Sequence, residues 1–235
     1  MLYLRRADER GKASFGWLDS RHSFSFGNYY DPKHMGISVL RVINDDTVAP
    51  GAGFDTHGHR DMEIISYVLE GAIEHKDSMG NSFVVPAGEV QRMTAGTGVT
   101  HSEFNHSQSE ALKFLQIWII PNQRDLTPGY EQKAIAQNGP LTPLVTPNGE
   151  DGSLTVHQNA GIYRLQLKDG ETLSLNPQRG IGYLHLIEGG VAVNDGQLAA
   201  GDGLGVMEES LELTAAESGV TALWFDLPRA PENAG

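Results

Sequence analysis

The sequence predicts an all-β protein. Short apolar runs recur along the chain, and each is bounded by Gly, Pro, Asp or Asn. The 28 glycines and 11 prolines are scattered between these runs, where turns would join strands. Few segments keep the apolar period of an amphipathic helix. With 39% hydrophobic and 20% charged residues, the 235-residue chain has the composition of a folded protein of one large or two small domains.

Strand-like runs occur on both sides of a long polar stretch. Before it they lie at residues 37–43, 63–70, 82–86 and 113–121; after it they lie at residues 153–157, 163–167, 181–194 and 220–227. Residues 122–153 are polar and rich in Pro and Gly, which is typical of a linker or a long crossing segment. We therefore predict an N-terminal domain at residues 1–136 and a C-terminal domain at residues 137–235.

The two halves share a short internal repeat. The letters L-E-G at 69–71 align with I-E-G at 187–189, and P-A-G-E at 86–89 aligns with A-A-G-D at 199–202. These matches suggest a repeated unit of roughly a hundred residues.

Two pairs of side chains that can bind metal share one spacing. His57 and His59 are two residues apart, as are His101 and Glu103. Alternate residues of a strand point to the same face, so two adjacent strands could direct all four side chains to one point. Imidazoles with a carboxylate suit Fe(II), Mn, Co, Ni, Cu or Zn, whereas calcium and magnesium require mostly oxygen ligands.

The second half lacks this group of side chains. At the positions that the internal repeat aligns with the two pairs, it has Leu175 and Pro177, then Thr214 and Ala216. None of these side chains is a usual metal ligand. We therefore expect one metal, held in the N-terminal half alone.

Charge and cysteine content exclude several classes of protein. A formal net charge of −13 without a Lys/Arg cluster disfavours direct binding to nucleic acid. The charged N-terminal segment is unlike a signal peptide, and no apolar run is long enough to span a membrane. We expect a cytoplasmic protein without membrane contact. The absence of cysteine excludes disulfides, zinc–thiolate sites and thiol nucleophiles.

Three motifs resemble the cupin superfamily and, within it, the pirin family. The run G-A-G-F-D-T-H-G-H-R-D-M-E at 51–63 resembles the first cupin motif, and G-N-S-F-V-V-P-A-G at 80–88 resembles the start of the second. The run Q-R-M-T-A-G-T-G-V-T-H-S-E at 91–103 is typical of pirins, where the second-motif histidine is delayed and followed by glutamate. The opening R-R-A-D-E-R-G and the run G-W-L-D-S-R-H-S-F-S-F-G-N-Y-Y-D-P are similar to bacterial members. The resemblance covers most of residues 1–120.

The resemblance to pirins implies a bicupin. Its two antiparallel β-barrels, each a double-stranded β-helix, would comprise an N-terminal barrel with the metal site and a degenerate C-terminal barrel. It implies one divalent metal held by His57, His59, His101 and Glu103. It also implies quercetin 2,3-dioxygenase activity, in which Glu103 would act both as ligand and as general base. The alternative is a regulatory pirin that senses redox state and binds a protein partner.

The cofactor and partners follow from the same resemblance. We expect iron first, with manganese, cobalt, nickel, copper or zinc as alternatives, because these ligands accept most first-row divalent ions. The expected substrates are a flavonol such as quercetin and dioxygen, and the expected state is a monomer. One departure from the family lies at Gly58, where pirins usually have proline, and it predicts a less rigid site.

Several residues have competing interpretations. General cupins often use the glutamate after the first motif, here Glu63, which could instead orient a ligand histidine through its second ring nitrogen. His75 is predicted to be solvated near a hairpin turn, while His157 and His185 are predicted to be packing or surface residues. The aromatic segment from His22 to His34 either lines the mouth of the site or packs as core.

Overall fold

The computed structural model describes residues 3–194 and 196–229, and the outer ends of both predicted domains lie outside these ranges. Within the described residues the extended elements are β-strands, and the helical turns are two short 3-10 helices, Ala7–Glu9 and Glu150–Gly152. The all-β prediction is confirmed. None of the described helices has the length and apolar character needed to cross a membrane.

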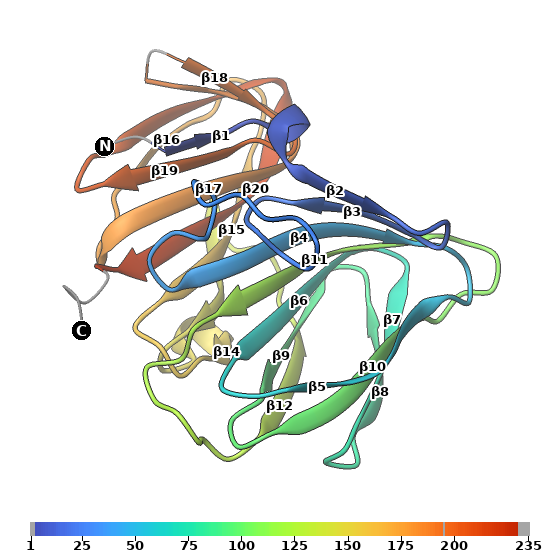
Figure 1. Ribbon diagram of the computed structural model, residues 1–235. Coiled ribbons are helices and arrows are strands. Elements are labelled where there is room, and N and C mark those ends of the chain that lie inside the picture. Colours follow the sequence, from blue (N-terminus) through green and yellow to red (C-terminus); the bar gives the residue numbers. More distant parts are fainter. Residues whose placement is uncertain (1–2, 195, 230–235) are drawn as a thin grey trace.

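Two of the three sheets come from the N-terminal half (Figure 1). The seven-stranded sheet has the order β12 (Gly129–Ala134), β9 (Glu89–Thr94), β6 (Glu63–Glu70), β11 (Leu112–Ile119), β4 (Leu40–Val48), β3 (Leu18–His22) and β2 (Gly11–Ser14). The four-stranded sheet has the order β5 (Gly53–His59), β10 (Val99–Asn105), β7 (Ala72–Asp77) and β8 (Ser82–Pro86).

The third sheet has nine strands and holds the C-terminal half. Its main path is β1 (Tyr3–Arg5), β19 (Gly203–Met207), β17 (Gly180–Val193), β20 (Leu211–Pro228), β15 (Gly161–Leu167), β13 (Leu141–Thr146) and β14 (Leu154–Thr155). Two further strands branch from it: β16 (Thr172–Leu175) pairs with β20, and β18 (Gly196–Ala199) pairs with β17.

The stretch predicted as a linker or a long crossing segment passes from one sheet to the other, and it contains ordered strands on both sides of the crossing. Strand β12 pairs with β9 of the seven-stranded sheet, and β13 pairs with β15 of the nine-stranded sheet. Proline and glycine gave this stretch a loop-like composition, but strands at the edge of a sheet tolerate both residues. The division of the chain at residues 136 and 137 stays a prediction.

The first strand belongs to the sheet of the opposite half. In Figure 1, the dark blue β1 lies among the orange and red strands of the C-terminal half. Leu4 pairs with Leu204 of β19. Beyond the strand, the Arg6 guanidinium lies 2.8 Å from the buried carboxylate of Asp202. The chain therefore connects the two halves at its beginning as well as through residues 120–140.

A shared apolar core joins the seven-stranded and nine-stranded sheets. Ile43, Ile65 and Leu115 from one sheet belong to the same buried cluster as Leu223 and Phe225 from the other. Burying this apolar surface is the main force that holds the halves together. Because side chains alternate along a strand, the next residues on the first sheet point to its opposite face. That opposite face carries the candidate site.

Candidate metal centre

The first two strands of the four-stranded sheet bring three histidines together. Strand β10 pairs antiparallel with β5, so that His101 lies opposite His57 and Val99 lies opposite His59. The ring centroids are 4.6 Å apart for His57 and His101, 4.8 Å for His57 and His59, and 4.9 Å for His59 and His101. The predicted convergence of two strands is thus present.

A glycine turn directs β10 toward β5. Gly96 has a φ of 46°, and a Cβ there would lie 1.9 Å from the carbonyl oxygen of Leu126. Only glycine fits both this backbone conformation and this close approach. The turn therefore fixes where β10 begins and, with it, the position of His101.

The ring nitrogens are arranged as metal ligands would be. The Nε2 atoms of His59 and His101 lie 3.0 Å apart, and His57 Nδ1 donates to the carbonyl oxygen of Asp55 at 2.7 Å, which leaves its Nε2 free. Burial lowers the pKa of His59 to about 4, helped by the neighbouring histidines, and burial also lowers the pKa of His101. The imidazoles of His59 and His101 are therefore neutral at pH 7, the form that binds metal. The donor set fits a first-row transition metal.

Glu103 is buried and held in place by three hydrogen bonds. Its Oε1 accepts from Gln91 Nε2 at 2.8 Å and from Ser66 Oγ at 3.1 Å, and its Oε2 accepts from Gln116 Nε2 at 2.9 Å. The hydroxyl and the two amides all donate, which suits an ionised carboxylate. The orientation of this carboxylate is therefore fixed from three strands.

The four predicted ligands fall into two overlapping groups. His57, His59 and His101 have ring nitrogens within 4.8 Å of one another, whereas Glu103 groups in the same way with His101 and His75. His101 belongs to both groups, so it lies between the histidine cluster and the carboxylate. The structure thus brings His57, His59 and His101 directly together and places Glu103 behind them.

His75 is buried beside the centre, and the prediction that it is solvated was wrong. Its side chain is fully buried, its Nε2 donates to the Asp77 carboxylate at 2.9 Å, and its ring stacks on Tyr130 with centroids 4.5 Å apart. The ring of His101 lies 5.5 Å away. Residues 75 and 77 have the same spacing of two as the other pairs, and strand β7 pairs with β10, so the pattern that found the other ligands applies here as well.

His75 and His101 each have one buried ring nitrogen to account for. The Nδ1 atoms of both rings are buried and lack a hydrogen-bond partner among the described residues. Because His75 donates through Nε2, the Nδ1 of a neutral His75 ring is an acceptor, while a His101 that binds metal through Nε2 has its proton on Nδ1. One ring thus offers an acceptor and the other a donor, so His75, held by Asp77, can orient His101.

A row of polar residues crosses the inner face of the seven-stranded sheet. Hydrogen-bonded neighbours in five adjacent strands place these side chains side by side: Gln91, Ser66, Gln116, Asn44 and His22. All five are buried. Three of them hold Glu103, and at the other end Asn44 Oδ1 lies 2.7 Å from His22 Nδ1. We call this feature the polar row; its residues lie far apart in the sequence.

The remaining candidates lie away from the three histidines. Glu63 is fully buried, and its Oε2 accepts from Thr94 Oγ1 at 3.1 Å and lies 3.5 Å from His157 Nδ1 of the C-terminal half. None of its hydrogen bonds within the described residues reaches a predicted ligand histidine. His185 is buried in the C-terminal half, as the packing interpretation expects, and His157 is partly exposed.

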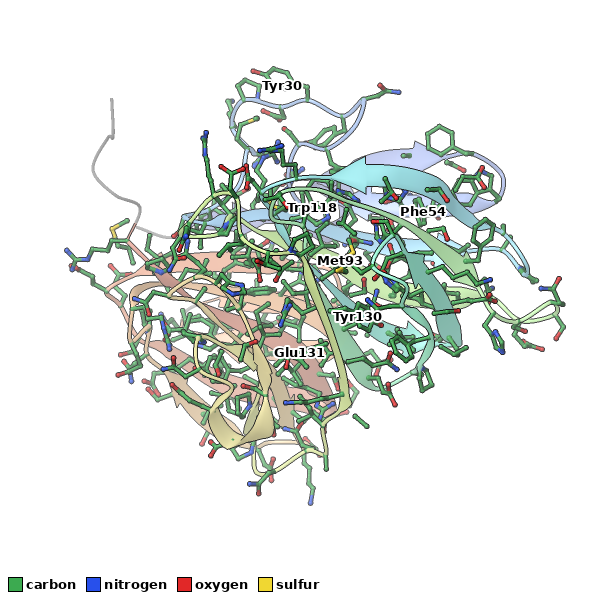
Figure 2. The ribbon with its side chains drawn as sticks, turned by 90° about the horizontal axis from the view of Figure 1, so that it is seen from below. Tyr30, Phe54, Met93, Trp118, Tyr130 and Glu131 are labelled. Atoms are coloured by element: carbon green, nitrogen blue, oxygen red, sulfur yellow. The ribbon has the colours of Figure 1, made fainter. Side chains whose placement is uncertain are left out.

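Two adjoining hollows give access to the centre. The inner pocket, of about 50 Å³, is lined by His57, His59, Glu103 and Trp118. The outer cavity, of about 490 Å³, lies beside it, and both hollows share Phe26, Asn44, Asp46 and Phe54 as walls. Figure 2 shows Trp118 and Phe54 in this half, below the projecting loop that carries Tyr30. A cavity of this size is in the range that binds small molecules.

Both interpretations of the aromatic segment hold, each for different residues. Phe24 is buried in the shared core, whereas His22, Phe26 and Tyr29 line the outer cavity. Phe26 also touches Trp118 edge to face, with centroids 5.3 Å apart. His34 lies apart from the cavity lining and contacts the Tyr3 hydroxyl.

Comparison with known proteins identifies the family. The Pirin family profile matches residues 4–119, and that of the quercetinase C-terminal cupin domain matches residues 143–227. The chain is 48% identical to quercetin 2,3-dioxygenase of Escherichia coli K12 over 230 residues, which are 97% of this chain and 99% of that protein. The chain belongs to the pirin family. The motifs at residues 51–63 and 91–103 therefore identified it correctly.

Solved structures agree with this membership. The bacterial pirin YhhW from Escherichia coli, in complex with nickel(II), superposes with a TM-score of 0.93 at 48% identity, covering 97% of this pirin and 99% of that chain. A quercetin 2,3-dioxygenase from Acinetobacter baumannii has a TM-score of 0.76 at 21% identity, covering 99% of this pirin and 89% of that chain, which shows a shared fold.

Proposed function

We propose that this pirin is a metal-dependent dioxygenase that cleaves a flavonol such as quercetin with O2 and releases carbon monoxide. The observation that carries the proposal is the cluster of three histidine rings at the wall of a pocket that adjoins a ligand-sized cavity. The relative at 48% identity is a quercetin 2,3-dioxygenase. We also infer the finer features of the fold: two cupin barrels, with the C-terminal barrel degenerate, in a cytoplasmic monomer.

The proposed ligands are His57, His59, His101 and Glu103. A divalent metal bound there would supply Lewis acidity that favours a deprotonated hydroxyl oxygen of the substrate. The YhhW relative binds nickel(II), while the ligand chemistry also accepts iron and the other first-row divalent ions. His101 would be the central ligand, because it groups with the other histidines on one side and with Glu103 on the other.

Glu103 is the proposed general base. Glu103 lines the inner pocket, and a carboxylate already fixed by Gln91, Ser66 and Gln116 needs little reorganisation to accept a proton from a bound hydroxyl. Trp118 Nε1 donates to Gln116 Oε1 at 3.3 Å, so the wall of the pocket and the base are connected. Phe26, Phe54 and Trp118 exclude water around the reacting carbon atoms.

A turnover assay tests the proposal. Metal-free protein is loaded separately with Fe, Mn, Co, Ni or Cu and incubated aerobically with quercetin, while the loss of flavonol absorbance and the release of carbon monoxide are followed. We expect both to proceed in step with at least one metal. His101→Ala should abolish both, whereas His106→Ala should leave them intact, because His106 is an exposed histidine just past the end of the same strand. The absence of turnover with every metal would refute the proposal.

A further inference from the structure

The outer cavity has a distinct chemical character. Much of its wall is aromatic: Trp17 and Phe54 are in edge-to-face contact at 5.2 Å between centroids, and Phe26 and Tyr29 both contact the ring of His22. Lys12 and Asn28 also line the cavity, and its other polar residues form one strip on two paired strands where the polar row ends: Ser20, His22, Asn44 and Asp46. Such walls bind a flat aromatic ring, and the polar strip sets how that ring is oriented.

Asp46 is the unusual group in this strip. Its side chain is buried, and its Oδ1 has no hydrogen-bond partner among the described residues; the other contact of the carboxyl is a hydrogen bond with Ser20. Burial raises the pKa of Asp46 to about 7, against the effect of the Ser20 bond. A buried polar atom without a partner costs free energy, so its presence in a cavity wall calls for an explanation.

The strip mainly accepts hydrogen bonds. Asn44 Oδ1 can only accept, so His22 Nδ1 donates to it and the His22 Nε2 is left as an acceptor. Burial lowers the pKa of His22, so this ring is neutral at pH 7. The Asp46 carboxyl lines both hollows, so the strip supplies acceptors beside the aromatic walls of the cavity. The matching ligand is an aromatic ring that carries hydroxyl groups, which donate.

The position of the cavity fixes how such a ring relates to the metal centre. The inner pocket of about 50 Å³ can hold only the part of a flavonol that reaches the histidines, and the outer cavity shares four wall residues with it. We propose that the outer cavity binds the phenolic ring of the substrate farthest from the metal, with Asp46 accepting a hydrogen bond from a ring hydroxyl. This inference rests on the proposed function and makes Asp46 a determinant of substrate choice.

Binding without turnover tests the inference. Metal-loaded protein is titrated under argon with quercetin or with 3-hydroxyflavone, which has the same skeleton and the 3-hydroxyl but no other hydroxyls. Quenching of Trp17 and Trp118, which line the two hollows, reports binding. The wild-type protein should bind quercetin at least about tenfold more tightly than 3-hydroxyflavone, as expected for a hydrogen bond to a buried polar group.

Two Asp46 variants and a neighbouring control separate recognition from structure. Asp46→Leu should lose the preference for quercetin while the Kd of 3-hydroxyflavone changes less than about threefold. Asp46→Asn keeps the shape and one acceptor oxygen, so it should lose part of the preference, and it remains informative if the leucine variant fails to fold. Asp45→Asn is the control, because Asp45 is the adjacent carboxylate but faces Arg10 outside the cavity. It should leave both affinities unchanged.

Each remaining outcome has a definite meaning. Equal weakening of both ligands in the Asp46 variants, or no weakening in either, would overturn the inference. If quercetin is cleaved and the Asp46 variants retain its affinity and KM, the inference fails while the proposed function stands. If quercetin binds with the expected preference but no metal supports cleavage, the proposed function fails and the hydroxyl-binding cavity stands.

Discussion

The two halves of this pirin have the same order of three neighbouring strands, but one half carries polar side chains at a level where the other carries apolar ones. In the N-terminal half, β9, β6 and β11 place Gln91, Ser66 and Gln116 side by side, and these residues hold Glu103. In the C-terminal half, β19, β17 and β20 are neighbours in the same order. At the matching level they carry Leu204, Leu184 and Trp224, all buried in one apolar cluster.

This difference shows how a repeated fold gains or lacks a site. Changing three side chains at one level of the sheet replaces a hydrogen-bonded support for a carboxylate by ordinary apolar packing. The backbone pairing is the same in both cases, because ladder hydrogen bonds do not depend on side chains. The internal repeat indicated this contrast at the ligand positions, and the structure extends it to the residues behind the ligands.

The largest expected effect comes from giving the N-terminal half the residues of the C-terminal half. The double variant His101→Thr with Glu103→Ala places there the side chains of Thr214 and Ala216. We expect metal content, measured by elemental analysis, to fall from about one ion per chain to about a tenth or less, because two of four ligands are lost. Circular dichroism should show an unchanged sheet signal. Full metal occupancy in this variant would remove both residues from the ligand set.

The reverse exchange should damage the C-terminal half. Leu184→Ser introduces, at the position that matches Ser66, a serine among buried apolar side chains. The change leaves a cavity and an unpaired hydroxyl, and it should lower the free energy of unfolding by about 3–5 kcal/mol. Ser66→Ala removes one of three hydrogen bonds to Glu103 and should cost about 1 kcal/mol. Urea denaturation measures both. Similar losses in the free energy of unfolding for the two variants would contradict the contrast between a polar level in one half and an apolar level in the other.

One buried titratable group in each half should make stability depend on pH, and the two dependences should have opposite sign. Burial raises the pKa of Asp46 to about 7 and lowers that of His185 to about 3. Between about pH 4 and 7, Asp46 is charged in the unfolded chain but neutral in the folded protein, so its contribution to stability falls as pH rises. Below about pH 6.5, His185 is charged in the unfolded chain but still neutral in the folded protein, so its contribution falls as pH falls. Asp46→Asn should therefore gain roughly 2–3 kcal/mol relative to wild type between pH 5 and 8.

His185→Gln is the counterpart of that experiment. Its stability relative to wild type should improve as pH falls from 7 to 4 and stay constant above pH 7, because the wild-type histidine is then neutral in both folded and unfolded states. Thermal unfolding at a series of pH values gives both profiles. Parallel profiles for the two variants would contradict the assignment of these opposite contributions.

A smaller effect should follow from loosening the support of His101. His75→Phe keeps the stacking on Tyr130 but removes the acceptor proposed for His101 Nδ1. Metal affinity, measured by competition with a chelator, should fall about tenfold, as for other residues that orient a ligand histidine. His106→Phe is the matched control at an exposed position. Unchanged affinity in His75→Phe would show that the buried pair of histidines is only packing.

The smallest effect is expected at Gly58. Its φ lies outside the left-handed region, and an added Cβ would meet Thr100 at an ordinary 3.9 Å. Gly58→Ala should therefore stabilise the protein by about 0.4–1 kcal/mol, mainly by restricting the unfolded chain. Thermal unfolding of the metal-free protein measures this gain. A loss of stability would show that the site requires glycine between its first two histidines.

The sequence predicted what depends on local pattern. Alternation and turn residues located strands such as β6 and β8, and the spacing of two found His57, His59, His101 and Glu103. The same spacing at residues 75 and 77 marks a third pair, although the turn motif that follows it predicts exposure.

The polar row could not be predicted in this way. Gln91, Ser66, Gln116, Asn44 and His22 come from five strands, and only the registers between those strands bring them to one level. A single residue of slip in any register would turn a side chain to the other face, and nothing in one sequence specifies these registers. The hydroxyl-binding cavity depends on the same registers, so it too became visible only in the structure.

The pairing of the first strand, β1, with the sheet of the C-terminal half has a consequence for biosynthesis. Residues 3–5 leave the ribosome long before residues 203–205, their partners in β19, have been made. Until then the N-terminal segment has no sheet to join, and afterwards the edge of β19 is open until that segment arrives. Contacts between distant parts of a chain form late, because a long loop must close first. Docking of β1 should therefore be among the last steps of folding, and it would add the second connection between the two halves.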